Sequence, residues 1–571
     1  MTDLSHAAVT GDLVEDTTDF FAPVSADVVD GLIGGYQAER QRIEYLHEMM
    51  TGGGYSGALW HFMEANSSDQ GRYYTTNIEN LMKLEPAIAS LNASYWGRAL
   101  ALTDVYDCMP QKRRQEWSDQ IRNPMGKKAE RRYRADGEGD EDRWAIHPLP
   151  EFEEASVRST LNDLLLARSQ FFAERVDGIF RALSGDHVTN QPQGFGMRMI
   201  VANMLTSYDS INHDRAGYLN DLRCVIAKFM GREEPRHGDT GPLLEIFRRR
   251  TGDWHEVDGG TIRMKMYKKG TCHIQVHPDM AWRLNAVLAS LYPLAIPASF
   301  RTKPKARAKS HKLFGRPLPF SVLNMLNGMR SEPCSPTRTD RWSEPRPPLT
   351  DCKWALQFDY GNRSAVVQEE AEKVLAMIGG VRRNKNSHVW FEFDFYARPV
   401  LDDIVISGCI PDQKAHQFYP TPVDLGAQLI ELADIGPTDR CAEPQAGVGG
   451  LADLMPKDRT RCIEVSELHC NVLRAKGFDV TQADFLEWAE TTSERFDRIV
   501  MNPPFSEGRW QSHTKAAGRL VADNGNLTAI LPASAKGKDL LPGFDHEWSS
   551  VIDNAFAGAS VSVVMLKATK Q

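Results

Sequence analysis

The stretch Arg498-Ile499-Val500-Met501-Asn502-Pro503-Pro504-Phe505 decides the fold of this chain. Its first four residues predict a buried strand, and the two prolines end it because each lacks a backbone donor and fixes φ. In an open α/β sheet, ligands bind beyond the carboxyl ends of the strands. We therefore expect the turn at residues 502–505 to hold an amide side chain, a carbonyl and an aromatic ring rigidly over one spot.

The segment around this turn, from residue 413 to the C-terminus, alternates short apolar β runs with helical segments. Such an alternation predicts an α/β fold, with helices on both faces of a mostly parallel sheet. Three further strands are expected, at residues 440–443, 461–465 and 479–481. Each is followed by, or carries, residues suited to binding a nucleotide-like ligand.

These residues begin with a glycine-rich turn at 444–450 (PQAGVGG), between the strand at 440–443 and a helix that starts near Leu451. Glycines there let the backbone approach a ligand closely, although a plain tight turn has the same composition. Glu464 can accept both hydroxyls of a ribose, or it is simply an exposed acid at a strand end. Asp484 offers an acceptor for an adenine amino group and Phe485 a ring to pack on its face, although Asp-Phe is a common dipeptide.

Residues 418–571 resemble S-adenosylmethionine-dependent amino-methyltransferases, in particular N6-adenine DNA methyltransferases. Phe418-Tyr419-Pro420-Thr421-Pro422 is similar to the family's most N-terminal cofactor motif. The stretch at 443–449 resembles Asp-Pro-x-x-Gly-x-Gly, with Glu443 replacing Asp, and Asn502-Pro503-Pro504-Phe505 matches the catalytic motif. Cofactor motifs that precede the catalytic motif are typical of the gamma group of DNA methyltransferases.

The resemblance implies a Rossmann-like sheet of seven strands with the last one antiparallel, S-adenosylmethionine as cofactor, and no metal. The implied catalytic residues are Asn502, Pro503, Pro504 and Phe505. The implied cofactor-binding residues are Phe418, Tyr419, Thr421, Glu443, Pro444, Ala446, Gly447, Gly449, Glu464, Val465, Asp484, Phe485 and Asn502.

The catalytic turn suits an exocyclic amine such as adenine N6, whose lone pair is delocalised into the ring. Acceptors at the Asn502 side chain and the Pro503 carbonyl can bind both N6 hydrogens and direct the lone pair at the methyl donor. Phe505 would stack on an adenine flipped out of the duplex. Methylation at cytosine C5 needs a cysteine nucleophile, and the only Pro-Cys pair, Pro333-Cys334, lies in a proline-rich segment. Two alternatives remain open: an RNA amino-methyltransferase, and a DNA-binding protein with a decayed methyltransferase domain.

The whole chain has 571 residues, of which 42% are hydrophobic and 25% charged, as in globular proteins. We expect four regions: a mainly helical α+β domain at 1–300 for DNA recognition or oligomerisation, a basic and proline-rich linker or DNA-contacting arm at 301–350, a small α/β unit at 351–412, and the catalytic domain at 413–571. No apolar run is long enough to span a membrane, and a cytoplasmic, nucleoid-associated enzyme is expected. A homodimer is possible, and the lack of a nuclease or helicase motif favours a stand-alone, phage- or prophage-type methyltransferase.

The N-terminal half contains two segments, QPQGFGMRMI at 191–200 and TCHIQVHPDMAWRLN at 271–285, that resemble an uncharacterised domain found ahead of phage and prophage adenine methyltransferases. The net charge of −9 means that a polyanion such as double-stranded DNA must meet a local basic surface. Candidate surfaces are residues 112–134, residues 382–385, and residues 301–316, which hold seven Lys/Arg and no acid. The predicted DNA-binding residues are Arg301, Lys303, Lys305, Arg307, Lys309, Lys312, Arg316, Arg509 and Trp510.

Overall fold

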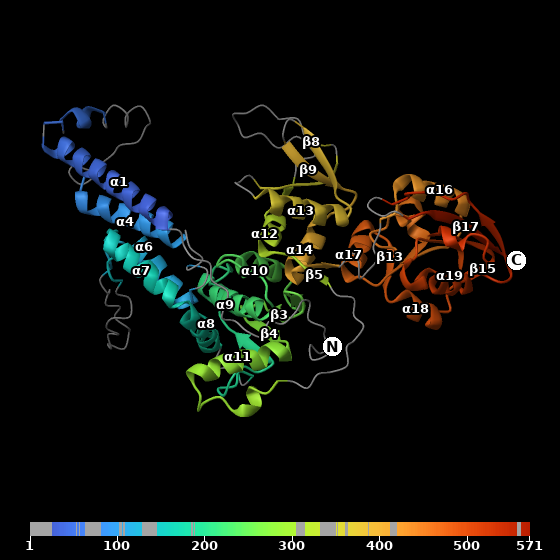
Figure 1. Cartoon of the computed structure of the whole chain (residues 1–571), viewed down its shortest axis with the longest axis horizontal. Helices are drawn as coiled ribbons and strands as arrows, with labels where there is room; N and C mark the ends of the chain where they lie inside the picture. The colour runs from blue at the N-terminus through green and yellow to red at the C-terminus, as the bar shows by residue number, and fades with distance from the viewer. Residues whose placement is uncertain are drawn as a thin grey trace. The chain divides into compact units, whose positions relative to one another are not determined.

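The computed structural model describes residues 26–52, 54–55, 57–62, 82–101, 106, 109–127, 146–183, 185, 187, 189–303, 315–331, 350, 352–359, 364–385, 388–411, 420–556 and 561–571. The chain divides into two compact units (Figure 1). One comprises Leu13–Glu245 and Met266–Pro304, and the other Met1–Asp12, Ile246–Lys265 and Lys305–Gln571. These units differ from the four predicted regions, because Ile246–Lys265 groups with the residues from Lys305 onward.

The N-terminal unit is mainly helical, as predicted. Its helices are α1 (Ala26–Gly52), α4 (Leu84–Ala101), α6 (Gln111–Arg122), α7 (Glu154–Leu166), α8 (Arg168–Ala182), α9 (His213–Phe229) and α11 (Pro278–Leu291). Aromatic side chains bury together, with Trp96 of α4 and Phe152, just before α7, in edge-to-face contact at 5.3 Å. Strands β1 (Arg198–Val201) and β4 (Cys272–Val276) pair antiparallel within this unit, and α10 (Thr240–Arg249) follows α9.

The C-terminal unit contains a small α/β part ahead of the large sheet. Its elements are β2 (His255–Val257), β3 (Ile262–Met266), β5 (Gly315–Pro317), α12 (Phe320–Asn327), β6 (Arg330–Ser331), β7 (Trp354–Gln357), α13 (Ala365–Met377), β8 (Val381–Lys385), β9 (His388–Phe393), α14 (Arg398–Ser407) and β10 (Cys409–Pro411). One antiparallel sheet has the order β6-β7-β9-β8, and β5 pairs with β10. Figure 1 shows α12, α13 and α14 beneath the β8–β9 hairpin.

The predicted linker at 301–350 is wrong for residues 315–331. Helix α12 buries Phe320, Val322, Leu323 and Leu326, and strand β5 pairs with β10 through Arg316 and Ile410. These apolar residues lie between the basic run at 301–316 and the proline-rich run at 333–348, whose compositions suggested a linker, yet they supply part of the core of the small α/β part.

The last region forms the predicted seven-stranded sheet, with the strand order β13-β12-β11-β14-β15-β17-β16. The strands are β11 (Cys441–Pro444), β12 (Thr460–Glu464), β13 (Asp479–Gln482), β14 (Phe496–Met501), β15 (Val521–Pro532), β16 (Phe544–Trp548) and β17 (Val563–Lys570). The first five along the chain run parallel, whereas β17 is antiparallel to both β15 and β16. This outcome confirms the predicted fold class.

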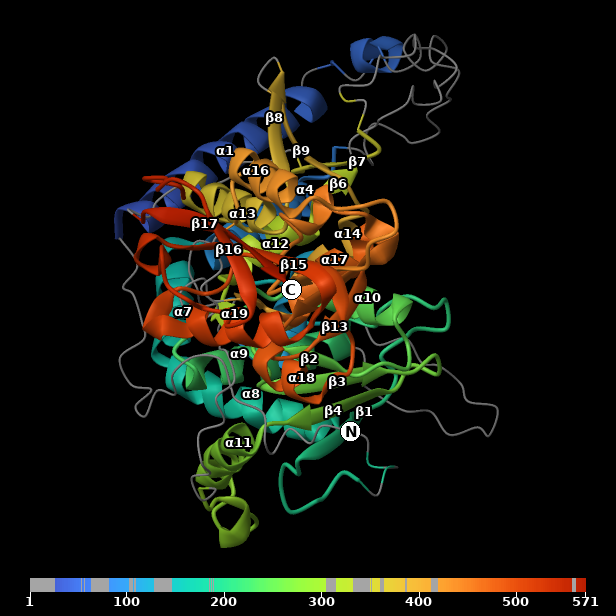
Figure 2. The same cartoon turned by 90° about the vertical axis from the view of Figure 1, so that its right-hand side faces the viewer.

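Helices cover both faces of this sheet because consecutive strand residues point to opposite sides. Cys441 and Val500 pack with α16 (Val423–Ala433), while Ala442 and Ile499 pack in a cluster with residues of α18 (Phe485–Thr491) and α19 (Arg509–Arg519). Helix α17 (Glu467–Lys476) packs on β12 and β13. Figure 1 shows α16 on one side of the sheet and α18 and α19 on the other, and Figure 2 gives the view turned by 90°. Among the described helices, none combines the length and apolar character that a membrane span requires.

Candidate active site

The predicted site residues gather at one edge of the large sheet. Strands β11, β12, β13 and β14 are parallel neighbours, so their carboxyl ends lie on the same side. The register pairs Pro444 with Ile463, and Glu464 with Gln482. The glycine turn, Glu464, Asp484 and Asn502 therefore follow or end adjacent strands, at the edge where ligands bind in open α/β sheets.

The glycine turn after β11 has a backbone that only a few residue types adopt readily. Gln445, Gly447 and Gly449 all have positive φ, at 57°, 55° and 91°. A side chain at Gly449 would also approach Leu473 of α17 to 3.0 Å. The turn is tied to β12 because Ala446 N donates to Ile463 O at 3.1 Å. Its glycines are thus required by the path of the chain.

Glu443 is a buried carboxylate that binds the backbone next to this turn. Its side chain is buried, and Oε2 accepts a hydrogen bond of 2.6 Å from Ala452 N, beyond the turn. Burial raises the pKa of Glu443 well above its ordinary value, and the nearby Glu464 carboxylate adds to the shift. Glu443 therefore ties the end of β11 to the segment that follows the glycine turn.

Glu464 is a buried carboxylate held by backbone donors. Gly447 N donates to Oε2 and Ser466 N to Oε1, both at 2.8 Å, and His469 Nδ1 lies 3.7 Å from Oε1. Burial alone would raise the pKa of Glu464, but His469 and the two backbone amides outweigh it, so the pKa is lowered. The group is therefore ionised near neutral pH, and each oxygen keeps a lone pair for a hydroxyl donor. The adjacent Val465 is 42% exposed, an apolar surface beside the carboxylate.

Asn502 contacts the predicted N-terminal cofactor motif. Its Nδ2 donates to Thr421 Oγ1 at 3.1 Å, across 81 residues of sequence. Asn502 is half-buried and Pro503 buried, directly after β14. With Nδ2 engaged by Thr421, the acceptor Oδ1 is the atom left to receive a donor from a ligand. Phe418 and Tyr419 lie outside the described residues.

Two predicted aromatic residues are buried in the core. Phe485 is 4% exposed and stacks on His513 at 5.8 Å within the core between α18, α19 and the sheet, so its ring packs there against protein. Trp510 is 5% exposed in the same core, so it cannot enter a base stack. Both helices need apolar residues to cover the sheet, and these aromatic rings fill that role.

The neighbouring predicted residues have defined local roles. Asp484 caps α18, with Oδ1 accepting from Leu486 N at 2.8 Å and from Glu487 N at 3.2 Å. The predicted loop at 506–513 is mostly helical, because α19 begins at Arg509. Arg509 donates a hydrogen bond to Ser506 Oγ at 3.1 Å. Phe505 is half-buried and contacts Phe556 edge to face at 6.3 Å.

Sequence reasoning missed Gln445 as a candidate ligand-binding residue. Both polar atoms of its amide are buried, and neither has a hydrogen-bond partner within the described residues. Buried amides are normally satisfied, so this group is suited to meeting a ligand beside the glycine turn. The one signal in the sequence that could have identified Gln445 is its position in the glycine turn.

The structure describes only some residues of the predicted basic arm. Arg301 and Lys303 are exposed, and Lys305, Arg307, Lys309 and Lys312 lie outside the described residues. Arg316 is not part of an arm: it lies in β5, and its Nη1 is 2.6 Å from Glu370 Oε1 of α13.

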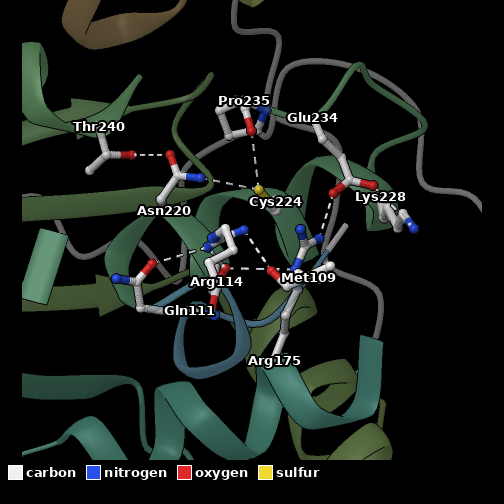
Figure 3. A network of polar contacts seen from close by, with 11 residues as sticks. Met109, Gln111, Arg114, Arg175, Asn220, Cys224, Lys228, Glu234, Pro235 and Thr240 are labelled. Carbon is white, nitrogen blue, oxygen red and sulfur yellow. Dashed lines mark hydrogen bonds and ion pairs between the residues drawn. The ribbon is translucent and has the colours of Figure 1, made fainter. Parts of the chain in front are cut away.

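A separate cavity of about 710 Å³ lies in the N-terminal unit and shares no residue with the predicted site. Gln111, Arg114 and Arg122 of α6 line it, with His213 and His237. Behind Arg114 is a buried charge network, shown in Figure 3, in which Arg175 Nη1 lies 2.6 Å from Glu234 Oε2. The side chains of Arg114, Arg175 and Asp221 are each only 1% exposed.

The strand order and the glycine turn define the fold of S-adenosylmethionine-dependent methyltransferases for the C-terminal domain. Residues 135–294 match a family described as a domain of unknown function (DUF4942), and this range includes both N-terminal segments singled out in the sequence. No curated protein sequence matches the chain.

Solved structures match part of the chain at low identity. TrmN from Thermus thermophilus is 17% identical over 37% of this chain and 69% of its own, with a TM-score of 0.23. N-methyltransferase NodS from Bradyrhizobium japonicum, in complex with S-adenosyl-L-homocysteine, is 15% identical over 27% of this chain and 88% of its own, with a TM-score of 0.23. A chain of a type I R-M system is 17% identical over 28% of this chain and 43% of its own, with a TM-score of 0.24. The fold assignment rests on the strand order.

Proposed function

We propose that this protein is an adenine-N6 DNA methyltransferase that uses S-adenosylmethionine. The observation that carries the proposal is the position of Asn502-Pro503-Pro504-Phe505 at the carboxyl edge of β14, one strand away from the glycine turn. The amide of Asn502 is oriented there by Thr421. Together these features support a site for an amine acceptor beside a site for a nucleotide-like methyl donor.

The residues at this edge fit S-adenosylmethionine. The ionised Glu464 has lone pairs for the ribose hydroxyls, and Val465 offers an apolar surface to an adenine ring. The unsatisfied amide of Gln445 and the positive-φ turn allow polar and close backbone contacts. When bound, the cofactor supplies an electrophilic methyl group on a sulfonium sulfur.

The chain's own residues would bind and orient the acceptor amine. Asn502 Oδ1 and the Pro503 carbonyl accept the two N6 hydrogens, which directs the nitrogen lone pair at the methyl group. The prolines hold these acceptors in place because their φ angles are fixed. The half-buried Phe505 supplies a ring face for the target base, which must leave the duplex to reach this turn.

The experiment is transfer of labelled methyl groups from S-adenosylmethionine to plasmid DNA that lacks adenine methylation, with structured RNA in parallel. We expect label in DNA, recovered as N6-methyladenine. Asn502→Ala should abolish transfer and leave cofactor binding intact. The control Asn524→Gly removes an exposed amide at a positive-φ position at the opposite end of the parallel strands, and it should retain full activity. Label in RNA alone would replace the proposal with an RNA methyltransferase, and no transfer to either substrate would contradict it.

A further inference from the structure

Strand β8 is an edge strand of the sheet β6-β7-β9-β8, and all five of its residues are exposed. It forms an antiparallel hairpin with β9, in which Arg382 pairs with Phe391 and Lys385 with His388. From residue 381 to residue 391 the chain contains two arginines, a lysine and a histidine but no acid. The hairpin is therefore a two-stranded ribbon whose outer strand carries only positive charge.

The two arginines of this ribbon are held in fixed orientations. Arg383 Nε donates to Glu392 Oε2 at 3.0 Å, and Arg382 Nε donates to Glu372 Oε2 of α13 at 3.1 Å. Because neighbouring strand residues face opposite sides, the two guanidinium groups project from the two faces of the ribbon. Their side chains remain 54% and 47% exposed. Each bond uses Nε, so the two Nη groups of each fork can bind a further anion.

Glu392, which orients Arg383, is itself fixed by two other donors. Thr350 Oγ1 and Trp390 Nε1 both donate to Oε1, at 2.5 Å and 3.0 Å. Charged residues on an edge strand also prevent pairing with other sheets. Preventing edge pairing requires only that the side chains are charged, in any orientation. The anchored Glu392 carboxylate instead holds the Arg383 guanidinium in one orientation, which suits the recognition of a bound anion.

The ribbon is linked to the domain that contains the candidate active site. Asp394, directly after β9, has Oδ2 3.4 Å from Lys476 Nζ at the end of α17. Asn471 Nδ2 of α17 donates to Asp403 Oδ2 of α14 at 2.9 Å. Helix α17 follows β12, whose last residue is Glu464. These contacts join the chain after β9, and helix α14, to the helix that follows Glu464.

We propose that the β8–β9 ribbon is a binding surface for double-stranded DNA that contacts backbone phosphates through Arg382, Arg383 and Lys385. A two-stranded β-ribbon fits the major groove of B-DNA, and the planar guanidinium fork matches phosphate oxygens. The inference rests on the proposed function for the choice of DNA. Because the net charge of the chain is negative, its contacts with DNA phosphates must come from a local basic surface, and we assign these contacts to the ribbon.

The test is the salt dependence of binding to a fluorescently labelled DNA duplex. The full-length variant Arg383→Ala/Lys385→Ala should bind more weakly, with a slope of log K against log [salt] shallower by about 2. Lys385→Ala alone, which breaks no anchoring bond, should reduce the slope by about 1. The control Arg495→Ala/Arg519→Ala removes two exposed charges just before β14 and β15, at the opposite edge, and should leave the slope unchanged.

Unchanged cofactor binding and circular dichroism would show that the variants are folded, and an unchanged slope would then overturn the inference. A loss of affinity for structured RNA alone would overturn the assignment to DNA. Methyl transfer separates this inference from the proposed function. Ribbon-dependent DNA binding without transfer in the wild type would contradict the function alone, whereas transfer with an unchanged slope in the variants would contradict the inference alone.

Discussion

Asn502 Nδ2 donates a hydrogen bond of 3.1 Å to Thr421 Oγ1, which joins the end of β14 to the segment that enters α16. An asparagine amide offers a donor on one side and an acceptor on the other, and it can rotate by half a turn at little cost. In the observed orientation Nδ2 faces Thr421 Oγ1. This leaves Oδ1, the atom that a target amine needs, at the carboxyl edge of the sheet.

Replacing Thr421 by valine keeps the shape of the side chain but removes this acceptor. Because one neutral hydrogen bond contributes about 1 kcal/mol, we expect kcat for methyl transfer to fall roughly fivefold to tenfold. Thr421→Ser, which keeps the hydroxyl, should retain wild-type kcat. Equal kcat values for valine and threonine would show that Asn502 is oriented by other means.

Glu464→Gln should weaken cofactor binding strongly. The new amide nitrogen must face either Gly447 N or Ser466 N, both of which now donate to the carboxylate at 2.8 Å. The neutral amide is also a weaker acceptor for the ribose hydroxyls. Because a hydrogen bond to a charged group contributes about 1.5–3 kcal/mol, Kd should rise roughly 10- to 100-fold in calorimetric titrations with S-adenosyl-L-homocysteine.

The matched control is Glu487→Gln, an exposed glutamate in the first turn of α18. It should bind the cofactor as the wild type does. A tight-binding Glu464→Gln variant would exclude the assigned role in holding the ribose.

His513 should make the C-terminal domain less stable in mild acid. Burial lowers the pKa of His513 from 6.5 to about 4. The charge of Arg509 lowers this pKa further, whereas the carboxylate of Asp484 raises it. Below about pH 6.5 the unfolded chain binds a proton that the folded chain does not, so this contribution to stability is lost as the pH falls toward 4. The loss should reach about 3 kcal/mol, since each pKa unit corresponds to about 1.4 kcal/mol.

The measurement is thermal unfolding of wild type and His513→Gln between pH 7 and pH 4. Glutamine stays neutral over this range, so the variant should show a smaller decrease in Tm on acidification. Parallel curves for the two proteins would mean that His513 does not titrate in this window.

Asp221→Ala should destabilise the N-terminal unit severely. Asp221 lies between Arg114 and Arg175, and all three side chains are 1% exposed. Removing one partner from a buried ion pair costs about 3–5 kcal/mol, because the remaining charges stay buried. Urea unfolding should therefore show a large loss of stability.

Glu154→Ala serves as the control for this prediction, since it breaks an exposed pair with Arg158 on α7. Exposed pairs contribute about 0–1 kcal/mol, so its unfolding midpoint should change little. Similar midpoints for the two variants would mean that the buried network relaxes without Asp221.

The fold of the C-terminal domain was predictable because its signals are local. Period-two apolar runs, the glycine turn at 444–450 and the proline-ended strand before Asn502 each specify a strand, a turn or a helix within a few residues of sequence. The family resemblance implied seven strands with the last one antiparallel, and the structure confirms this. Residues 315–331 were misjudged because the flanking basic and proline-rich runs concealed a short helix and strand between them.

By itself, the sequence determined which strand ends carry ligand-suited groups: Glu464, Asn502 and the glycine turn. Only the tertiary structure decided which side chains are available there. Phe485 and Trp510 point into the core because α18 and α19 must bury an apolar face against the sheet, whereas Gln445 is left without a partner. The physical reason is that residue type and spacing act along the chain, while burial and hydrogen-bond pairing depend on contacts between segments as distant as Thr421 and Asn502.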